Sequence, residues 1–171
     1  MAILAKRLTG YVLQNKYVDT SVQKGGVPQV KGCIEHFGAM WEMIKDAKLS
    51  RQDLSVVWLD LANAYGAVPH VLVLRALRYY NVPDKIINII ILTLYFSGVF
   101  GSGIFLGCVI SVIIFVLVMN LSDEYFKVKV PRAIQYHNYK GDTPAPVLKL
   151  FMDDAGPTTA LLRDMIEVLV E

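Results

Sequence analysis

The longest uncharged stretch of this chain restricts its possible folds more than any other feature. Residues 86–122 contain no Asp, Glu, Lys, Arg or His. Within this stretch, residues 103–119 are almost wholly apolar, and their number just reaches the roughly 17–25 residues that a membrane-spanning helix needs. A helix that is buried on all sides in a globular domain shows the same pattern. The stretch therefore predicts either a hydrophobic membrane hairpin at residues 86–119 or a deeply buried helix.

The polar residues in and around this stretch argue against the membrane hairpin. Its first half, residues 86–100, is short for a membrane span and contains Asn88 and Thr93. The nearest positive charges are Lys85 and Lys127, whereas membrane spans usually have an excess of Lys and Arg on one side. The hydrophobic fraction of 54% is above the roughly 45–50% that is usual for soluble domains, so composition alone leaves both interpretations open.

The charged residues are distributed unevenly along the chain. Residues 1–51 carry eight Lys or Arg against four Asp or Glu, a net charge of +4, and the remaining residues carry nine against eleven, a net charge of −2. A basic part beside an acidic part suits a polymer of phosphates held near metal ions, although an ordinary solvated surface has the same pattern. The two cysteines and three histidines show no zinc-ligand spacing, so we expect no zinc site.

Two apolar segments end in carboxylates. Residues 56–59, rich in Val and Trp, are typical of a buried strand and are followed by Asp60. Residues 148–152 are followed in the same way by Asp153 and Asp154. If the two strand ends lie side by side, the three acids form a cluster that needs cations to neutralise it, and Mg²⁺ prefers such oxygen ligands. Each acid taken alone is equally typical of a solvated turn.

Four motifs follow one another in an order that is found in a known family. Residues 23–28 read Gln-Lys-Gly-Gly-Val-Pro, residues 60–65 read Asp-Leu-Ala-Asn-Ala-Tyr, residues 107–115 begin with Gly and continue as a Ser-containing apolar helix, and residues 151–154 read Phe-Met-Asp-Asp. In these motifs the chain resembles the reverse transcriptases of non-LTR, LINE-like retrotransposons.

The resemblance implies a fold. We expect an α+β polymerase palm core, in which a small antiparallel sheet packs on helices, at residues 53–171. A partial helical fingers segment is expected at residues 1–52, and the thumb is absent. A palm of this kind buries its middle-motif helix, so the resemblance favours the buried helix over the membrane hairpin.

The resemblance also implies an RNA-directed DNA polymerase. A primer 3′-hydroxyl would attack the α-phosphate of an incoming deoxynucleoside triphosphate, with two Mg²⁺ (or Mn²⁺) ions clamping the reacting oxygens. The implied catalytic and metal-binding residues are Asp60, Asp153 and Asp154, and the backbone carbonyl of Leu61 would also face the metals. The implied partners are an RNA template and a DNA primer, inside the cell in the cytoplasm or nucleus.

Three further residues match nucleotide contacts of this family. Tyr65 would lie under the sugar and exclude a 2′-hydroxyl, Gly107 would lie beside the nucleotide, and Lys24 would contact a phosphate. The alternatives are a packed tyrosine and a flexible solvated loop around Lys24.

The chain departs from the family in two places. After Phe96 it is shorter, as if one hairpin were lost, and Leu106 stands where the family has Gln or Thr. We therefore expect a defective fragment with little or no polymerase activity. The alternatives are a small membrane-associated protein with the hairpin at residues 86–119, and a non-catalytic remnant that binds nucleic acid.

Several segments have helical patterns. Residues 2–18 predict an amphipathic helix with Leu4, Leu8 and Val12 on one side. Pro69 is suited to the first turn of a helix that Asn81 ends, and a further helix is predicted to begin near Asp84.

Two more helices are predicted by their apolar faces. Residues 33–48 form one, and its apolar stripe, expected to lie in the core, consists of Cys33, Phe37, Met40, Trp41 and Ile44. Residues 159–170 form the other, capped by Thr158, and its buried face is expected to consist of Leu161, Leu162, Met165, Ile166 and Leu169.

Overall fold

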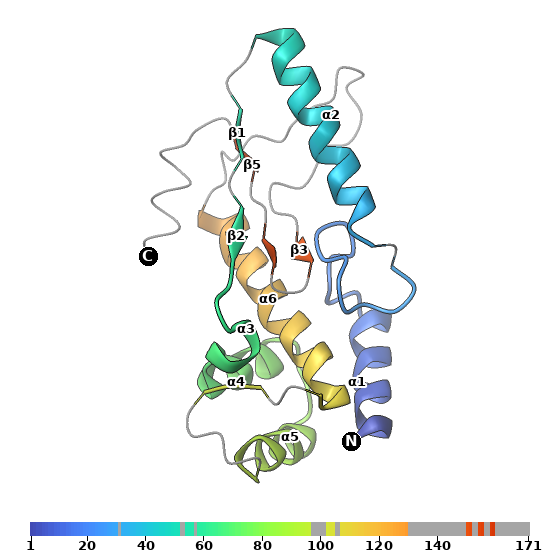
Figure 1. Ribbon diagram of the computed structural model, residues 1–171. Helices are drawn as coiled ribbons and strands as arrows, with labels where there is room; N and C mark the ends of the chain where they lie inside the picture. Colours follow the sequence, from blue (N-terminus) through green and yellow to red (C-terminus); the bar gives the residue numbers. More distant parts are fainter. Residues whose placement is uncertain are drawn as a thin grey trace. The chain divides into compact units, whose positions relative to one another are not determined.

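A computed structural model of the chain describes residues 1–30, 32–51, 54–56, 58–96, 102–104, 107–129, 150–151, 154–155 and 158–159 (Figure 1). Its helices are α1 (Ala2–Gln14), α2 (Ile34–Ser50), α3 (Ala64–Ala67), α4 (His70–Tyr79), α5 (Asp84–Phe96) and α6 (Val109–Lys129). Its strands are β1 (Ser55–Val56), β2 (Leu59–Asp60), β3 (Leu150–Phe151), β4 (Asp154–Ala155) and β5 (Thr158–Thr159).

The predicted α+β polymerase palm core is wrong. Helices make up most of the part of the chain that the structure describes, and each strand within it is only two residues long. A sheet that can cover helices is normally built from strands of about five or six residues. The prediction took the apolar runs before Asp60 and Asp153 for full strands, whereas the strands described within these runs are two residues long. The long apolar segments instead satisfy their backbone groups within helices.

The short strands pair in two antiparallel groups. In one, β1 pairs with β5, so that Ser55 lies opposite Thr159. In the other, β4 lies between β2 and β3. Thr158 and Thr159 were predicted to cap and begin a helix, and here they form a strand. Pairing with β1 supplies their backbone groups with hydrogen-bond partners, which a helix start would leave partly unsatisfied.

The chain divides into two compact units. Unit 1 consists of residues 1–19 and 61–121, and unit 2 of residues 20–60 and 122–171. Unit 1 therefore contains α1, α3, α4, α5 and most of α6, whereas unit 2 contains α2 and the strands. Each unit is described by itself below.

The core of unit 1 is built around α6. Every residue from Ile113 to Asn120 is buried, so this segment is enclosed on all sides. Around it, α4 packs against α5, and α1 contributes buried Leu8 and Val12. None of the helices in the described ranges has both the length and the apolar character that crossing a membrane requires.

One polar residue connects three segments of unit 1. The Asn120 side chain, 1% exposed, donates from Nδ2 to the Tyr17 carbonyl at 2.9 Å and to the Tyr80 hydroxyl at 2.7 Å. Its Oδ1 accepts from the backbone N–H of Asp19 at 3.1 Å. These bonds join the loop after α1 and the end of α4 to α6. The bond to the Tyr80 hydroxyl is buried and the other two are part-buried, so loss of the Asn120 amide would remove partners from groups with limited access to water.

The helix starts predicted around Pro69 and Asp84 are confirmed. Pro69 is the N-cap of α4, which ends at Tyr79, and Asn81 follows with a left-handed φ of 54°. A left-handed residue cannot continue a right-handed helix, and asparagine adopts this conformation more readily than most residues. The next helix, α5, begins at Asp84.

The predicted core stripe of α2 is wrong for three of its members, because Cys33, Phe37 and Trp41 are all exposed. Phe37 is 66% exposed and Trp41 is 61% exposed. The buried residues of this helix are instead His36, Met40, Met43 and Ala47. His36 Nε2 donates to the carbonyl oxygen of Val22 at 2.7 Å, in a buried position. This bond orients the helix so that the face with His36 and Met40 turns inward.

Candidate functional site

The two acid-ended segments of the sequence meet in unit 2. Asp60 of β2 and Asp154 of β4 are register partners in an antiparallel pair. Phe151 of β3 is the partner of Asp154 on its other side. Directly opposite residues of an antiparallel pair have β-carbons about 4.5–5.5 Å apart and lie on one face of the ladder. The backbone thus brings two segments together that lie far apart in the sequence.

The other predicted metal-site residues are placed only in part. Asp153 lies outside the described residues. Leu61, whose carbonyl was expected to face the metals, follows β2 directly and its side chain is 41% exposed. Among the side chains that the structure describes, no group of three or more His, Cys, Asp or Glu could hold a metal ion. Asp60 and Asp154 are described by their backbone alone, so they do not belong to this set.

The turn after β2 contains a residue with a left-handed backbone conformation. Asn63 has a left-handed conformation, with φ 51° and ψ 45°, and precedes α3 as its N-cap. A β-carbon at Gly66 would overlap the side-chain amide of Asn63, so a larger residue here would require the exposed Asn63 side chain to move. The motif that begins at Asp60 therefore contains one residue, Asn63, whose type suits the left-handed backbone of this turn.

Tyr65, the predicted nucleotide contact, is packed in unit 1. Its ring stacks on Phe115 of α6, with centroids 4.5 Å apart and an interplanar angle of 17°. Phe115 is fully buried, whereas Tyr65 is only partly buried. One face of the tyrosine ring is therefore occupied by a core residue. This arrangement agrees with a packed tyrosine.

Gly107, the second predicted nucleotide contact in unit 1, lies just before α6. Its φ is +91°, a conformation that favours glycine, and a β-carbon there would meet no atom within 4 Å. Three residues earlier, the N–H of Ile104 donates to the carbonyl oxygen of Tyr65 at 2.7 Å, and that of Gly103 donates to Val68 at 2.7 Å. These bonds hold the segment before α6 against the turn that contains Tyr65.

Lys24 is engaged by a carboxylate. Its Nζ lies 2.7 Å from Oε2 of Glu35, in the first turn of α2, and the Lys24 side chain is 14% exposed. A phosphate would have to replace or join Glu35 to bind this cation. Lys24 belongs to unit 2 with Asp60 and Asp154, whereas Tyr65 and Gly107 belong to unit 1.

The sequence places Gln23 in the motif at residues 23–28 but does not predict its burial. Gln23 is fully buried, and among the residues that the structure describes neither Nε2 nor Oε1 of its amide has a hydrogen-bond partner. A buried amide without partners costs roughly 1–3 kcal/mol, so most proteins avoid it. The sequence signal for a special role of Gln23 was its position at the start of the motif at residues 23–28. In an apolar core, leucine or methionine would pack as well as glutamine, so packing alone does not explain the residue type.

A comparison of this chain with protein-family models and with curated proteins finds no match to either. The resemblance to reverse transcriptases therefore depends on the four short motifs alone.

Proposed function

We propose that this chain carries the metal-binding part of a reverse-transcriptase-type nucleotidyl-transfer site and does not complete the reaction by itself. The observation that carries this proposal is the register of Asp60 opposite Asp154. Both acids come from motifs that resemble the same family and follow one another in that family's order.

The chemistry of this pair favours a divalent cation. Two like charges directly opposite each other on antiparallel strands are unfavourable. A cation removes this repulsion, and Mg²⁺ binds carboxylate oxygens in preference to other protein groups. Asp153, adjacent in sequence to Asp154, would provide a third carboxylate. In a complete enzyme such a site would bind Mg²⁺ or Mn²⁺ and the triphosphate of a deoxynucleotide, next to an RNA template and a DNA primer.

Metal binding alone does not give catalysis. Phosphoryl transfer depends on holding the attacking hydroxyl, the phosphate and the metals in line, which requires rigid surroundings. In this chain the described strands are only two residues long, and Lys24 is paired with Glu35. Leu106 also stands where the family has a polar residue. We therefore expect metal binding without detectable primer extension.

The test is isothermal titration calorimetry of the full chain with Mg²⁺ and with Mn²⁺. We expect binding at millimolar or better affinity in the parent, and its loss in Asp60→Asn and in Asp154→Asn. Asp84→Asn is the matched control, because Asp84 is an exposed aspartate in the first turn of α5. Far-ultraviolet circular dichroism of each variant shows whether its helices are retained.

Two results would contradict the proposal. Equal binding by the parent and both variants would place the metal elsewhere, and absent binding in the parent would mean that the acids do not converge. If the parent binds nucleic acid in EDTA but binds no metal, a non-catalytic nucleic-acid-binding remnant becomes the better description.

A further inference from the structure

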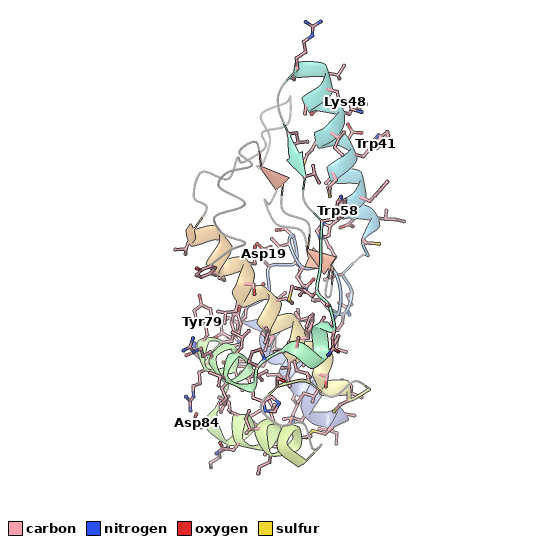
Figure 2. The ribbon with its side chains drawn as sticks, turned by 60° about the vertical axis from the view of Figure 1, so that its left-hand side comes forward. Asp19, Trp41, Lys48, Trp58, Tyr79 and Asp84 are labelled. Carbon is pink, nitrogen blue, oxygen red and sulfur yellow. The ribbon has the colours of Figure 1, made fainter. Side chains whose placement is uncertain are left out.

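The outer face of α2 carries apolar and basic side chains together. The large apolar residues on it are Ile34, 83% exposed, Phe37, 66%, Trp41, 61%, and Leu49, 74%. Lys45 and Lys48 are exposed on the same side of the helix. Figure 2 shows Trp41 projecting away from the axis of α2, whereas the buried residues of the helix lie on its opposite face. Exposed apolar residues that follow one another along a helix are typical of a surface that packs against a partner.

The charges of α2 limit the kind of partner that fits this face. Residues 34–42 contain two acids and no Lys or Arg, a net charge of −2, whereas residues 43–51 contain three bases and one acid, a net charge of +2. The helix is therefore neutral as a whole, and a nucleic acid or an anionic membrane would meet as many acids as bases. A second α2 in the opposite direction fits better, because each half then lies beside a half of opposite charge.

The order of the residues along this face suits an antiparallel pair. The residues Ile34, Gly38, Trp41, Lys45 and Leu49 follow one another at helical spacing, and the spacing is nearly the same when it is read from either end. When Ile34 lies opposite Leu49 of a second copy, Gly38 therefore lies opposite Lys45, and the two Trp41 side chains meet in the middle. A two-fold axis produces this self-complementary arrangement, in which every contact occurs twice.

Gly38 leaves room for the lysine side chain. A β-carbon at Gly38 would meet no atom within 4 Å, so the space above the helix backbone is open there. The methylene stem of Lys45 from the second copy would fill this space and keep its ammonium group at the edge of the contact. One turn after Gly38 the ammonium group would reach Glu42, whose side chain is 64% exposed, whereas Glu35 is already paired with Lys24. The antiparallel pair thus gives the lysine a partner and does not bury its charge alone.

The contact involves one helix from each copy, so we expect a weak dimer. Stable interfaces bury roughly 1,200–2,000 Å² in total, and we expect a pair of 17-residue helices to lie at or below the low end of that range. Association of this kind is reversible and depends on the concentration of the chain.

We propose that two copies of this chain associate through the outer faces of α2, antiparallel, with Ile34 of each copy opposite Leu49 of the other. The interface includes neither Asp60 nor Asp154 and does not depend on metal binding. Its failure and the failure of the proposed function are therefore separate results.

The first test is sedimentation velocity of the full chain over a series of concentrations in EDTA. We expect the weight-average sedimentation coefficient to rise with concentration from the monomer value. Trp41→Glu should raise the dissociation constant about tenfold or more, because it places two like charges in the middle of the interface. The matched control is Trp58→Glu, since Trp58 is 67% exposed and lies outside α2, and it should leave the dissociation constant unchanged. Far-ultraviolet circular dichroism of both variants shows whether the helices are retained.

The second test fixes the orientation of the two helices. In a background with Cys33→Ser and Cys108→Ser, a chain with Ile34→Cys is mixed with a chain with Leu49→Cys under mild oxidation. We expect a disulfide between the two different chains, identified by mass spectrometry, and little cross-linking when either chain is oxidised alone. Cross-linking of each chain with itself instead would indicate parallel helices and would overturn the proposal.

Other occupants of this face give different results, and each of them would overturn the proposal. A dimer that Trp41→Glu leaves intact would place the interface elsewhere. In a chain that stays monomeric at every concentration, blue-shifted Trp41 emission of a Trp58→Phe variant would show that the chain's own residues cover α2, and red-shifted emission would show that the face is bare. A monomer that binds a single-stranded oligonucleotide, with the affinity lost in Trp41→Glu, would assign the face to nucleic acid.

Discussion

α6 and α2 are both long helices rich in large apolar residues, yet they use these residues differently. In α6 the apolar residues surround the helix, and all positions from Ile113 to Asn120 are buried. In α2 they occupy two sides, and the side with Phe37 and Trp41 is exposed. A helix that is apolar all round has no wrong orientation in a core, whereas a two-sided helix needs a specific contact to decide which side turns inward. For α2 that contact involves buried His36.

The largest effect should come from a matched pair of isoleucines. Ile114 in α6 is 1% exposed and Ile34 in α2 is 83% exposed. We expect Ile114→Ala to lower the free energy of unfolding by about 2–5 kcal/mol, because it removes buried methyl groups and leaves a cavity. Ile34→Ala should change it by less than about 0.5 kcal/mol. Urea unfolding followed by circular dichroism measures both, and similar losses in the two variants would break the comparison.

A smaller effect should follow from removing the buried amide of α6. Asn120→Ala leaves the Tyr17 carbonyl, the Tyr80 hydroxyl and the Asp19 N–H without this partner. We expect a loss of about 2–3 kcal/mol in the free energy of unfolding, since buried groups without partners are costly. Asn88→Ala, at an exposed asparagine of α5, is the control and should cost under about 0.5 kcal/mol. An Asn120→Ala variant as stable as the control would mean that water or a shift of α1 replaces these bonds.

The smallest effect concerns the ion pair at the start of α2. Glu35→Gln removes the charge that faces Lys24, and the Glu35 side chain is 43% exposed. We expect a loss of about 1 kcal/mol or less, reduced further by added salt, because water screens such pairs. The control is Glu42→Gln, whose partner Lys45 lies 3.8 Å away with both side chains more than half exposed. A loss well above that of the control at high salt would show that Lys24 belongs to a more deeply buried network.

The sequence motifs predicted only part of the candidate site. The motif that begins at Asp60 and the one that ends at Asp154 were recognisable from residue order, and the backbone makes these two residues register partners. The engagement of Lys24 by Glu35 and the stacking of Tyr65 on Phe115 could not be predicted. Both depend on side chains that lie far outside the motif concerned, and a motif contains no information about them.

The sequence by itself determined the local features of this protein. The uncharged stretch requires burial, Pro69 and Asn81 bound a helix, and Gly107 allows a left-handed turn before α6. Each of these follows from the conformational preference of one residue or from the cost of exposing apolar surface.

The tertiary structure alone decided which elements would be strands and which face of α2 would be buried. The two-residue strand β4 exists only because a distant segment pairs with it, since its own residues, Asp154 and Ala155, do not favour an extended form. The inward face of α2 likewise depends on His36 bonding to Val22 in another segment. Long-range pairing of this kind leaves no periodic pattern in the sequence. The palm fold was predicted from the motif resemblance and from apolar runs taken for full strands, whereas the described part of the chain is mainly helical.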